Sequence, residues 1–409
     1  AADELAGSAA ATTRTLDVEM RQLDLDALRI VDSRIDIEAV TALRDPLLQV
    51  QDAIDDLDQA MADSQNGWLV PPVADKLTEL AVEIDDQQVV SQRALEALDV
   101  APAVLGADGE RVYFVMFTTP AEARGQGGFM GNYAEITIDQ GYIEMTEFGR
   151  HTDLNSGGER PRKLVDAPAD WLARYGPFGY QKGPDQIVGG QPWSNITMSP
   201  NFPATAQVVA ELYPQSGGQE IDGVVSLDVY ALAQLVGLVG PLEIDGAPAP
   251  LTASNTAQFL LVEQYFEDDV GDRVDMLESV ARTTVERLLS VAPPEPVALG
   301  KAMAPMVEQG RVLAWAADDA ERSVLAAANL DGALLDDVSD GDGSHGVAVT
   351  VVNAGGSKID TFLERDYEYV SGPAGDELRL SLTNTAPATG YPDYVIGNWF
   401  DLPSGTSRL

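Results

Sequence analysis

The first hundred residues carry hydrophobic side chains at the three- and four-residue steps that are typical of amphipathic helices. These side chains belong to Leu16, Met20, Leu23, Leu28, Ile30, Ile35, Leu47, Leu48, Val50, Ile54, Leu57 and Met61. The spacing predicts three or more helices between Leu5 and Val100, and Pro71 with Pro72 marks the start of the last one, over Val73–Leu98.

Beyond residue 106 the pattern changes to runs of strand length. Arg111–Phe117 is almost continuously apolar, and Gly131–Ile138 alternates between apolar and polar side chains. Shorter strands are expected at Tyr142–Met145, Gly223–Leu227, Leu242–Ile244, Val312–Trp315, Val347–Val352 and Glu377–Thr383. Helical spacing covers Pro203–Leu212, Asp228–Gly237, Thr252–Val291 and Asp318–Asn329. This alternation predicts an α/β (α+β) fold with a central mixed sheet flanked by helices.

The same pattern predicts three regions, and a chain of 409 residues is long enough for two or three domains. We expect a helical stalk or bundle over residues 1–104, an α/β core over 105–291 and a small α/β region over 292–409. The polar stretch between Phe148 and Gly190 is too long for an ordinary connection, which favours a functional loop region there.

Composition excludes several kinds of chemistry. The chain has no Cys and two His, so disulfides, thiolate nucleophiles and Cys- or His-rich metal sites are excluded. Its 66 acidic and 25 basic residues give a formal net charge of −41, which argues against a nucleic-acid partner because such binding depends on Lys and Arg. The apolar runs are shorter than the ~20 residues that span a bilayer. The abrupt start at Ala1 suggests a fragment whose membrane anchor lay upstream.

A glycine-rich loop, Glu122–Gly131, lies between the first two predicted strands. Gly127 and Gly128 let backbone N–H groups approach an anion, and Arg124 offers a fork of donors for phosphate or carboxylate. The alternative is a glycine-rich bend between strands with no ligand. Asn132, just after the loop, and Arg162, further along the chain, are two more candidates for ligand binding.

Basic residues cluster in one stretch and are then absent until Arg273. The clustered residues are Arg124, Arg150, Arg160, Arg162, Lys163, Arg174 and Lys182. Arg273 follows an acidic run and suits either a salt bridge or a mixed site in which acids hold a divalent cation and arginines hold phosphate oxygens. His151 follows Arg150 and lies near Asp153, so it is either a general acid or base or a surface histidine.

The loop Arg124-Gly-Gln-Gly-Gly-Phe-Met-Gly-Asn-Tyr133 resembles a signature of the bacterial domain-of-unknown-function 4012 family. Three other segments are similar to that family's motifs: Met198–Pro203, Asp222–Asp228 with Gly240-Pro241, and Asn353–Asp360 with Thr383-Asn384. The resemblance extends from the N-terminal helices to about Tyr394.

A more distant resemblance is to the LytR-CpsA-Psr family, carried by Ile221–Ile244, Leu251–Ala257 and the Asp272-Arg273 pair. Members of that family are extracytoplasmic, membrane-anchored enzymes that transfer glycopolymers from polyprenyl pyrophosphate carriers to the cell wall. The resemblance implies that Arg124, Arg150 and Arg273 contact phosphates. It also implies that Asp153 or Asp272 holds Mg²⁺. The chain departs from the family at Gly149-Arg-His-Thr-Asp153, which stands where the family has Pro-Arg-Asp.

These observations lead to one functional expectation and two alternatives. We expect an extracytoplasmic, envelope-associated protein that binds or transfers a phosphorylated or polyprenyl-linked glycan, with a cell-wall polymer as partner. The first alternative is a non-catalytic surface or assembly scaffold on the same fold. The second is a glycan hydrolase that uses two carboxylates, which requires an open groove with acids about 5–10 Å apart.

Overall fold

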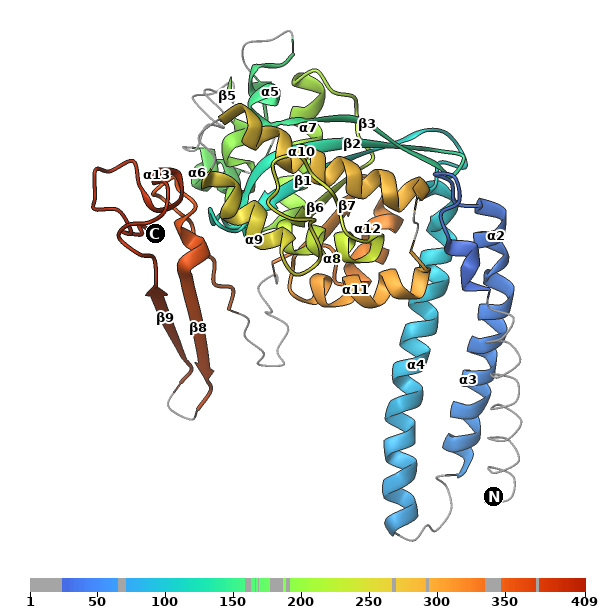
Figure 1. Ribbon diagram of the computed structural model, residues 1–409. Coiled ribbons are helices and arrows are strands. Elements are labelled where there is room, and N and C mark those ends of the chain that lie inside the picture. Colours follow the sequence, from blue (N-terminus) through green and yellow to red (C-terminus); the bar gives the residue numbers. More distant parts are fainter. Residues whose placement is uncertain are drawn as a thin grey trace.

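The computed structural model describes residues 24–64, 71–158, 163–165, 167, 169–176, 187–188, 192–266, 270–291, 294–334, 347–372 and 375–409. A sheet-and-helix body carries two projections, a long helical hairpin and a shorter β-hairpin (Figure 1). The α/β architecture predicted from the sequence is therefore confirmed.

The helical projection consists of α3 (Arg44–Ser64) and α4 (Pro71–Val104), preceded by α2 (Ile37–Ala42) and a short 3₁₀ turn at Leu25–Leu28. One hydrophobic cluster joins the two long helices. Its buried side chains are Val50, Ile54, Met61 and Ile84. Arg44 donates to Asp99 at 2.7 Å near the base of the hairpin. The predicted N-terminal helices thus form a projecting pair, and α4 extends six residues beyond the predicted end at Leu98.

The central sheet has five strands in the order β3-β2-β1-β6-β7. They are β1 (Arg111–Thr119), β2 (Phe129–Asp139), β3 (Tyr142–Arg150), β6 (Gly223–Asp228) and β7 (Val312–Ala316). Only the β1–β6 pair is parallel, so this sheet is mixed as predicted. The predicted boundary between residues 291 and 292 falls between strands of this one sheet, because β7 pairs with β6.

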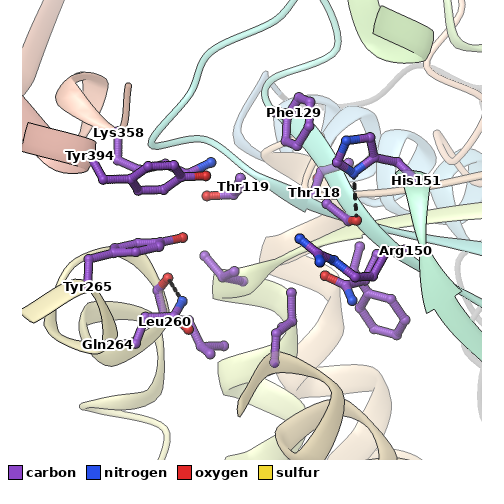
Figure 2. Close-up of a pocket in the computed structure, with 15 residues that line it drawn as sticks. Thr118, Thr119, Phe129, Arg150, His151, Leu260, Gln264, Tyr265, Lys358 and Tyr394 are labelled. Carbon is purple, nitrogen blue, oxygen red and sulfur yellow. Dashed lines mark hydrogen bonds between the residues drawn. The ribbon is translucent and has the colours of Figure 1, made fainter. Parts of the chain in front are cut away.

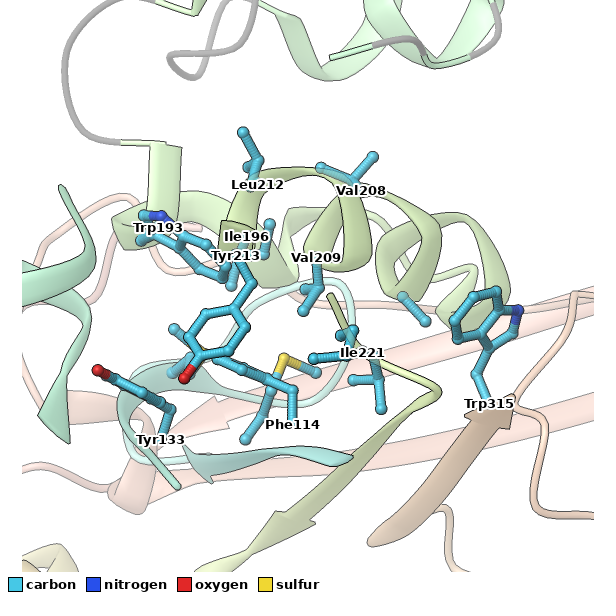
Figure 3. Close-up of a cluster of buried hydrophobic side chains, with 14 of the residues drawn as sticks. Phe114, Tyr133, Trp193, Ile196, Val208, Val209, Leu212, Tyr213, Ile221 and Trp315 are labelled. Carbon is cyan, nitrogen blue, oxygen red and sulfur yellow. The ribbon is translucent and has the colours of Figure 1, made fainter. Parts of the chain in front are cut away.

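Helices cover both faces of the sheet. The side chains of β1 alternate between these two faces, so β1 contributes to the core on each side. Val112, Phe114 and Met116 face one layer, while Phe117 faces the other. The first layer contains α7 (Phe202–Gln215) and η3 (Pro192–Met198), which pack around Phe114 (Figure 3). The second contains α8 (Val229–Val239), α9 (Thr256–Leu261) and α10 (Val270–Glu286).

The remaining elements connect these layers. They are α5 (His151–Ser156), β4 (Lys163–Leu164), α6 (Ala169–Tyr175), β5 (Ile187–Val188), η4 (Glu263–Phe266), the π-helical η5 (Arg287–Val291), α11 (Pro296–Glu308) and α12 (Asp319–Ala327).

Three details of the predicted secondary structure are wrong. The helix expected over Thr252–Val291 is divided into α9, η4, α10 and the π-helical turn. The expected strand Leu242–Ile244 forms only an isolated bridge between Leu242 and Leu251. Val347–Val352 is not a strand, because its backbone pairs with no strand of the described residues. An alternating pattern of valines is typical of a strand, but a strand also needs a neighbouring strand with which its backbone can pair.

The C-terminal segment joins the body before it forms the β-hairpin. It contains η6 (Ile359–Phe362), β8 (Leu363–Val370), β9 (Glu377–Asn384) and α13 (Asp393–Ile396). The Asn353 N–H donates to Ala123 O at 2.9 Å, and the Asp360 N–H donates to Ala121 O at 3.1 Å. The segment from Asn353 to Asp360 is therefore hydrogen-bonded to the loop that follows β1.

Phe114 offers a test of this packing, because its side chain is fully buried. The centroid of its ring lies 5.2 Å from that of Tyr133 and 4.8 Å from that of Tyr213. We expect Phe114→Ala to lower the free energy of unfolding by about 3–5 kcal/mol through cavity formation. Urea denaturation followed by circular dichroism measures this. Phe266→Ala, which truncates a half-exposed ring, is the matched control and should cost much less. Equal losses in the two variants would contradict the packing described.

Candidate functional site

A cavity of about 150 Å³ lies at the end of β1, where the sheet, the second helical layer and the C-terminal segment meet (Figure 2). Its polar side chains come from three separate parts of the chain. They are Thr118, Thr119, Asn132, Arg150, His151, Gln264, Tyr265, Lys358 and Tyr394. Its apolar side chains are Phe117, Phe129, Val229, Leu260 and Leu277.

Strand register places the first group of these residues. Phe117 of β1 is opposite Asn132 of β2, and Asn132 is opposite Arg150 of β3. The three residues therefore form a row across the sheet. Because Arg150 ends β3 and His151 begins α5, both side chains lie at the same edge. The N–H of Arg150 donates to Asp153 Oδ2 at 2.9 Å, which caps α5.

The Arg150 side chain lines this cavity, as Figure 2 shows. Among the residues that the structure describes, its guanidinium has neither an ion-pair nor a hydrogen-bond partner. A guanidinium has five N–H donors in a planar fork that matches phosphate or carboxylate. Arg150 is thus a cation available to an anionic ligand.

His151 lies beside Arg150 with its ring at right angles to that of Phe129, the two centroids 4.8 Å apart. Burial, together with the charges of Arg150 and Lys358, lowers the pKa of His151, so the imidazole is neutral at pH 7. Its Nδ1 lies 3.1 Å from Gly131 O. A carbonyl oxygen only accepts, so we place the proton on Nδ1, which leaves Nε2 as the unprotonated nitrogen.

A buried cluster of three charges borders the cavity: Glu122, Arg124 and Lys358. Glu122 accepts from Arg124 at 2.6 Å through one carboxylate oxygen and from Lys358 at 3.0 Å through the other. Burial alone would raise the pKa of Glu122, but the two cations outweigh it and lower this pKa. Burial likewise opposes the charge of Lys358, yet Glu122 raises the pKa of Lys358 above its usual value. Glu122 and Lys358 are therefore both charged at neutral pH.

Arg124 therefore forms a salt bridge with Glu122. Its guanidinium also donates to the carbonyl oxygens of Ala123 and Asn353. It lies in the wall of an adjoining cleft of about 1250 Å³, which shares Phe129, His151 and Tyr394 with the smaller cavity. Whether Arg124 also contacts a ligand stays a prediction.

The glycines of the loop are explained by close backbone packing. A Cβ on Gly128 would lie 2.5 Å from Thr119 O, and one on Gly125 would lie 2.1 Å from Met198 O. Gly127 has a φ of +99°, a conformation that strongly favours glycine. Close approach thus serves the loop's own fold, and anion binding by Gly127 and Gly128 stays a prediction.

Sequence reasoning missed Lys358, although it had singled out the segment Asn353–Asp360. Other predicted residues cannot be placed: Arg162 lies outside the described residues, as do the side chains of Asp272 and Arg273. The backbone of Arg273 is in α10, one helical turn before the cavity residue Leu277.

Mg²⁺ binding stays a prediction, since the side chain of Asp272 lies outside the described residues. Asp153 caps α5 through Oδ2, and no three acidic or histidine side chains among these residues are grouped as metal ligands. We therefore assign no chemical step to a metal ion.

Residues 108–265 match a family model described as "Protein of unknown function (DUF4012)". This region belongs to the DUF4012 family. The match covers the DUF4012 loop, Glu122–Gly131, together with Arg150 and His151, whereas Lys358 lies outside it. The predicted family is confirmed, while the likeness to LytR-CpsA-Psr enzymes stays a prediction.

The search of curated proteins gave no match. Among solved structures, the chain is similar to a crystal structure of the transcriptional regulator yvhJ from Bacillus subtilis, with 12% sequence identity and a TM-score of 0.25. The likeness covers 68% of this chain and 91% of that one. A TM-score this low establishes neither a shared fold nor a shared function.

The buried charge cluster predicts an order of stabilities. Lys358→Met leaves Glu122 with one cation and should lower the free energy of unfolding by about 3 kcal/mol. Glu122→Gln leaves two buried cations without their carboxylate and should cost more. Because the folded pKa of Glu122 is lowered, its contribution is fully present above about pH 4.5 and is lost as the pH falls through that folded pKa.

Urea denaturation at pH 7 and pH 4 measures both effects. The stability difference between wild type and Glu122→Gln should shrink at the lower pH. Glu368→Gln, which disrupts an exposed pair with Arg379, is the control and should change stability little. A reversed order of Lys358→Met and Glu122→Gln would show that the cluster is not held by Glu122.

His151 gives a second, independent test because the chain has only two histidines. We expect its imidazole to titrate below 6.5, with the proton of the neutral ring on Nδ1. Nuclear magnetic resonance of the imidazole carbons and nitrogens measures both properties, and His345→Gln assigns the signals. The lowered pKa means that stability from His151 is present above about pH 6.5 and is lost as the pH falls further. Titration of His151 above 6.5 would rule out the burial described.

Proposed function

We propose that this cavity binds the phosphate of a phosphorylated or polyprenyl-linked glycan. The observation that supports this proposal most strongly is the Arg150 guanidinium, which lines the cavity and has no ion-pair partner among the described residues. A partly buried cation without a counterion favours an anionic ligand, because the ligand supplies the missing charge and acceptors.

Local charge supports the same proposal against the acidity of the whole chain. Arg150, Arg124 and Lys358 supply three cations. Two carboxylates contact these residues: Glu122 pairs with Arg124 and Lys358, and Asp153 accepts from the backbone N–H of Arg150. These five groups therefore leave a net positive charge beside the cavity, although the chain has a formal net charge of −41. An anion that reaches the cavity is held by this local field, which buried surroundings screen only weakly.

The apolar wall of the cavity fits the carbon chain of a polyprenyl phosphate. Phe117, Val229, Leu260 and Leu277 line the same cavity as Arg150 and come from the sheet and the second helical layer. An isoprenoid carbon next to a phosphate requires such a junction between cationic and apolar surfaces. A free inorganic phosphate would leave this apolar surface uncovered.

His151 supplies the group needed for transfer. Its unprotonated Nε2 can accept the proton of an acceptor hydroxyl as the hydroxyl oxygen attacks phosphorus. The bond from phosphorus to the carrier's bridging oxygen then breaks, and the carrier leaves with that oxygen. Arg150 stabilises the negative charge that develops on the phosphoryl oxygens. In this proposal the acceptor is a cell-wall polymer and the protein acts at the cell envelope.

A search of the described helices found none with the length and hydrophobicity of a membrane span.

The scaffold alternative expects each of the arginines to form its own salt bridge. Arg124 meets that expectation through Glu122, whereas Arg150 does not. The difference between these two arginines favours ligand binding.

Isothermal titration calorimetry with farnesyl phosphate tests the proposal. We expect Arg150→Ala to weaken binding about tenfold or more, because a charge-assisted hydrogen bond contributes about 1.5–3 kcal/mol. Arg150→Lys should recover part of the affinity, since it restores the charge without the planar fork. Arg273→Ala tests the second predicted arginine in the same assay.

Arg44→Ala is the matched control, because Arg44 pairs with Asp99 on the helical hairpin away from the cavity. Its affinity should equal that of the wild type. Farnesol and inorganic phosphate, titrated separately, should each bind more weakly than farnesyl phosphate. Unchanged affinity in Arg150→Ala would eliminate this cavity as the phosphate site.

A further inference from the structure

The cleft of about 1250 Å³ that adjoins the Arg150 cavity has an exposed tryptophan in its wall, Trp399. This residue is 82% exposed, whereas the other tryptophans in the described part of the chain are buried, namely Trp171, Trp193 and Trp315. A tryptophan side chain offers a large apolar surface together with one N–H donor. Its exposure in the wall of a cleft therefore favours a ligand that covers the ring.

One face of the Trp399 indole rests on the backbone of Gly356. A Cβ on Gly356 would lie 2.7 Å from Cε2 and 2.8 Å from Cδ2 of the indole. These two atoms form the bond shared by the two rings, so Gly356 lies against a face of the indole and not against its edge. The exposed surface of the ring must then include the opposite face.

Hydrogen bonds fix the loop that carries Trp399. The N–H of Trp399 donates to Gly355 O at 3.1 Å. The side-chain Oδ1 of Asn398 accepts from the N–H groups of Phe400 and Leu402, at 3.0 and 3.1 Å. A ligand that stacks on the indole therefore does not have to order this loop, which lowers the entropic cost of binding.

The cleft leads from Trp399 to the proposed phosphate site. Phe129, His151 and Tyr394 line both the cleft and the Arg150 cavity, and Figure 2 shows all three around that cavity. Tyr394 is 49% exposed, so it offers a second aromatic surface between Trp399 and His151. The volume of the cleft exceeds the range of about 300–1,000 Å³ that is typical of small-molecule sites, which favours an extended ligand.

The charges in the cleft argue against an anionic ligand. The charged side chains that line it are Glu122, Arg124, Asp393 and Asp401, which are three carboxylates and one cation. Asp393 and Asp401 are exposed, and their carboxylates have no ion-pair or hydrogen-bond partner among the described residues. They can therefore accept hydrogen bonds from a ligand.

The polar lining also argues against a hydrocarbon chain. It consists of hydroxyl and amide side chains from three segments: Ser194, Asn195, Asn353, Ser357, Asn398 and Ser404. A neutral saccharide fits all of these features. Its hydroxyl groups donate to carboxylates, and the C–H groups on the flat side of a pyranose ring carry a partial positive charge that suits the negative face of an indole.

We propose that this cleft binds a neutral oligosaccharide, with one pyranose ring stacked on Trp399 and the chain directed past Tyr394 towards His151. The inference rests on the proposed function in one respect: the saccharide at the His151 end would be the acceptor of the phosphoryl group. The evidence for saccharide binding is separate, because Arg150 does not line the cleft and Trp399 does not line the Arg150 cavity.

The test is a titration of the whole chain with three neutral trisaccharides, used separately: maltotriose, cellotriose and N,N′,N″-triacetylchitotriose. We expect at least one of them to shift the tryptophan fluorescence to shorter wavelength, since stacking removes the exposed indole of Trp399 from water. Trp399→Ala should abolish this shift. In isothermal titration calorimetry, Trp399→Ala should weaken binding about tenfold or more, a difference of about 1.4 kcal/mol.

Two further variants show whether the effect comes from the ring. Trp399→Tyr should recover part of the affinity, because it keeps an aromatic face at this position. Tyr367→Ala is the matched control, since it removes a ring on β8 that is 43% exposed and does not line the cleft. Its affinity should equal that of the wild type. Circular dichroism should show that all three variants fold as the wild type does.

Farnesyl phosphate separates this inference from the proposed function. Trp399→Ala should keep farnesyl phosphate binding, and Arg150→Ala should keep trisaccharide binding. If none of the three trisaccharides binds, or if Trp399→Ala leaves their binding unchanged, the inference is overturned, even where farnesyl phosphate binds through Arg150. Trisaccharide binding that depends on Trp399, without farnesyl phosphate binding, would retain the saccharide site and reject the phosphate site alone. Choline that binds through Trp399 more tightly than every trisaccharide would overturn the inference in favour of a cation site.

Discussion

The buried ion pairs of Glu122 connect the parts of the molecule that form the site. Glu122 follows β1, Arg124 is two residues further on, and Lys358 comes from the C-terminal segment. Glu122 is the member on which this cluster depends, since its removal would leave two buried cations without a counterion. The segment that carries Lys358 is therefore fixed against the loop after β1, and it closes one side of the Arg150 cavity.

Asp360 adds further contacts that hold the same segment in place. Asp360 is on the same segment as Lys358, and its backbone and side chain are both hydrogen-bonded to the loop after β1. Lys358 lines the Arg150 cavity. Its position there depends on two sets of contacts with the loop after β1, the ion pair with Glu122 and the hydrogen bonds of Asp360.

The sequence predicted the sheet well because local patterns determine strands such as β1 and β2. Arg150 could also be predicted, as it lies in the basic cluster and directly before His151. Lys358 could not, because its partner Glu122 is 236 residues away and no local pattern marks such a pair. Val347–Val352 shows the same limit, since its alternation is that of a strand but pairing depends on distant residues.

The role of Arg124 shows why residue type alone does not decide function. A guanidinium in a glycine-rich loop suits both phosphate and a carboxylate of the protein, and sequence leaves both open. Burial decides between them here, because Arg124 is 7% exposed and Glu122 lies within hydrogen-bonding distance. Arg150, at the strand end with no such carboxylate among the described residues, keeps its donors for a ligand.

The most direct test of the account is a crystal structure of the chain with farnesyl phosphate. The account predicts phosphate oxygens within hydrogen-bonding distance of the Arg150 guanidinium, with the first isoprenoid carbons against Leu260 and Leu277. It also predicts that Lys358 stays paired with Glu122. Phosphate bound elsewhere, with Arg150 turned to a carboxylate of the protein, would contradict the central claim.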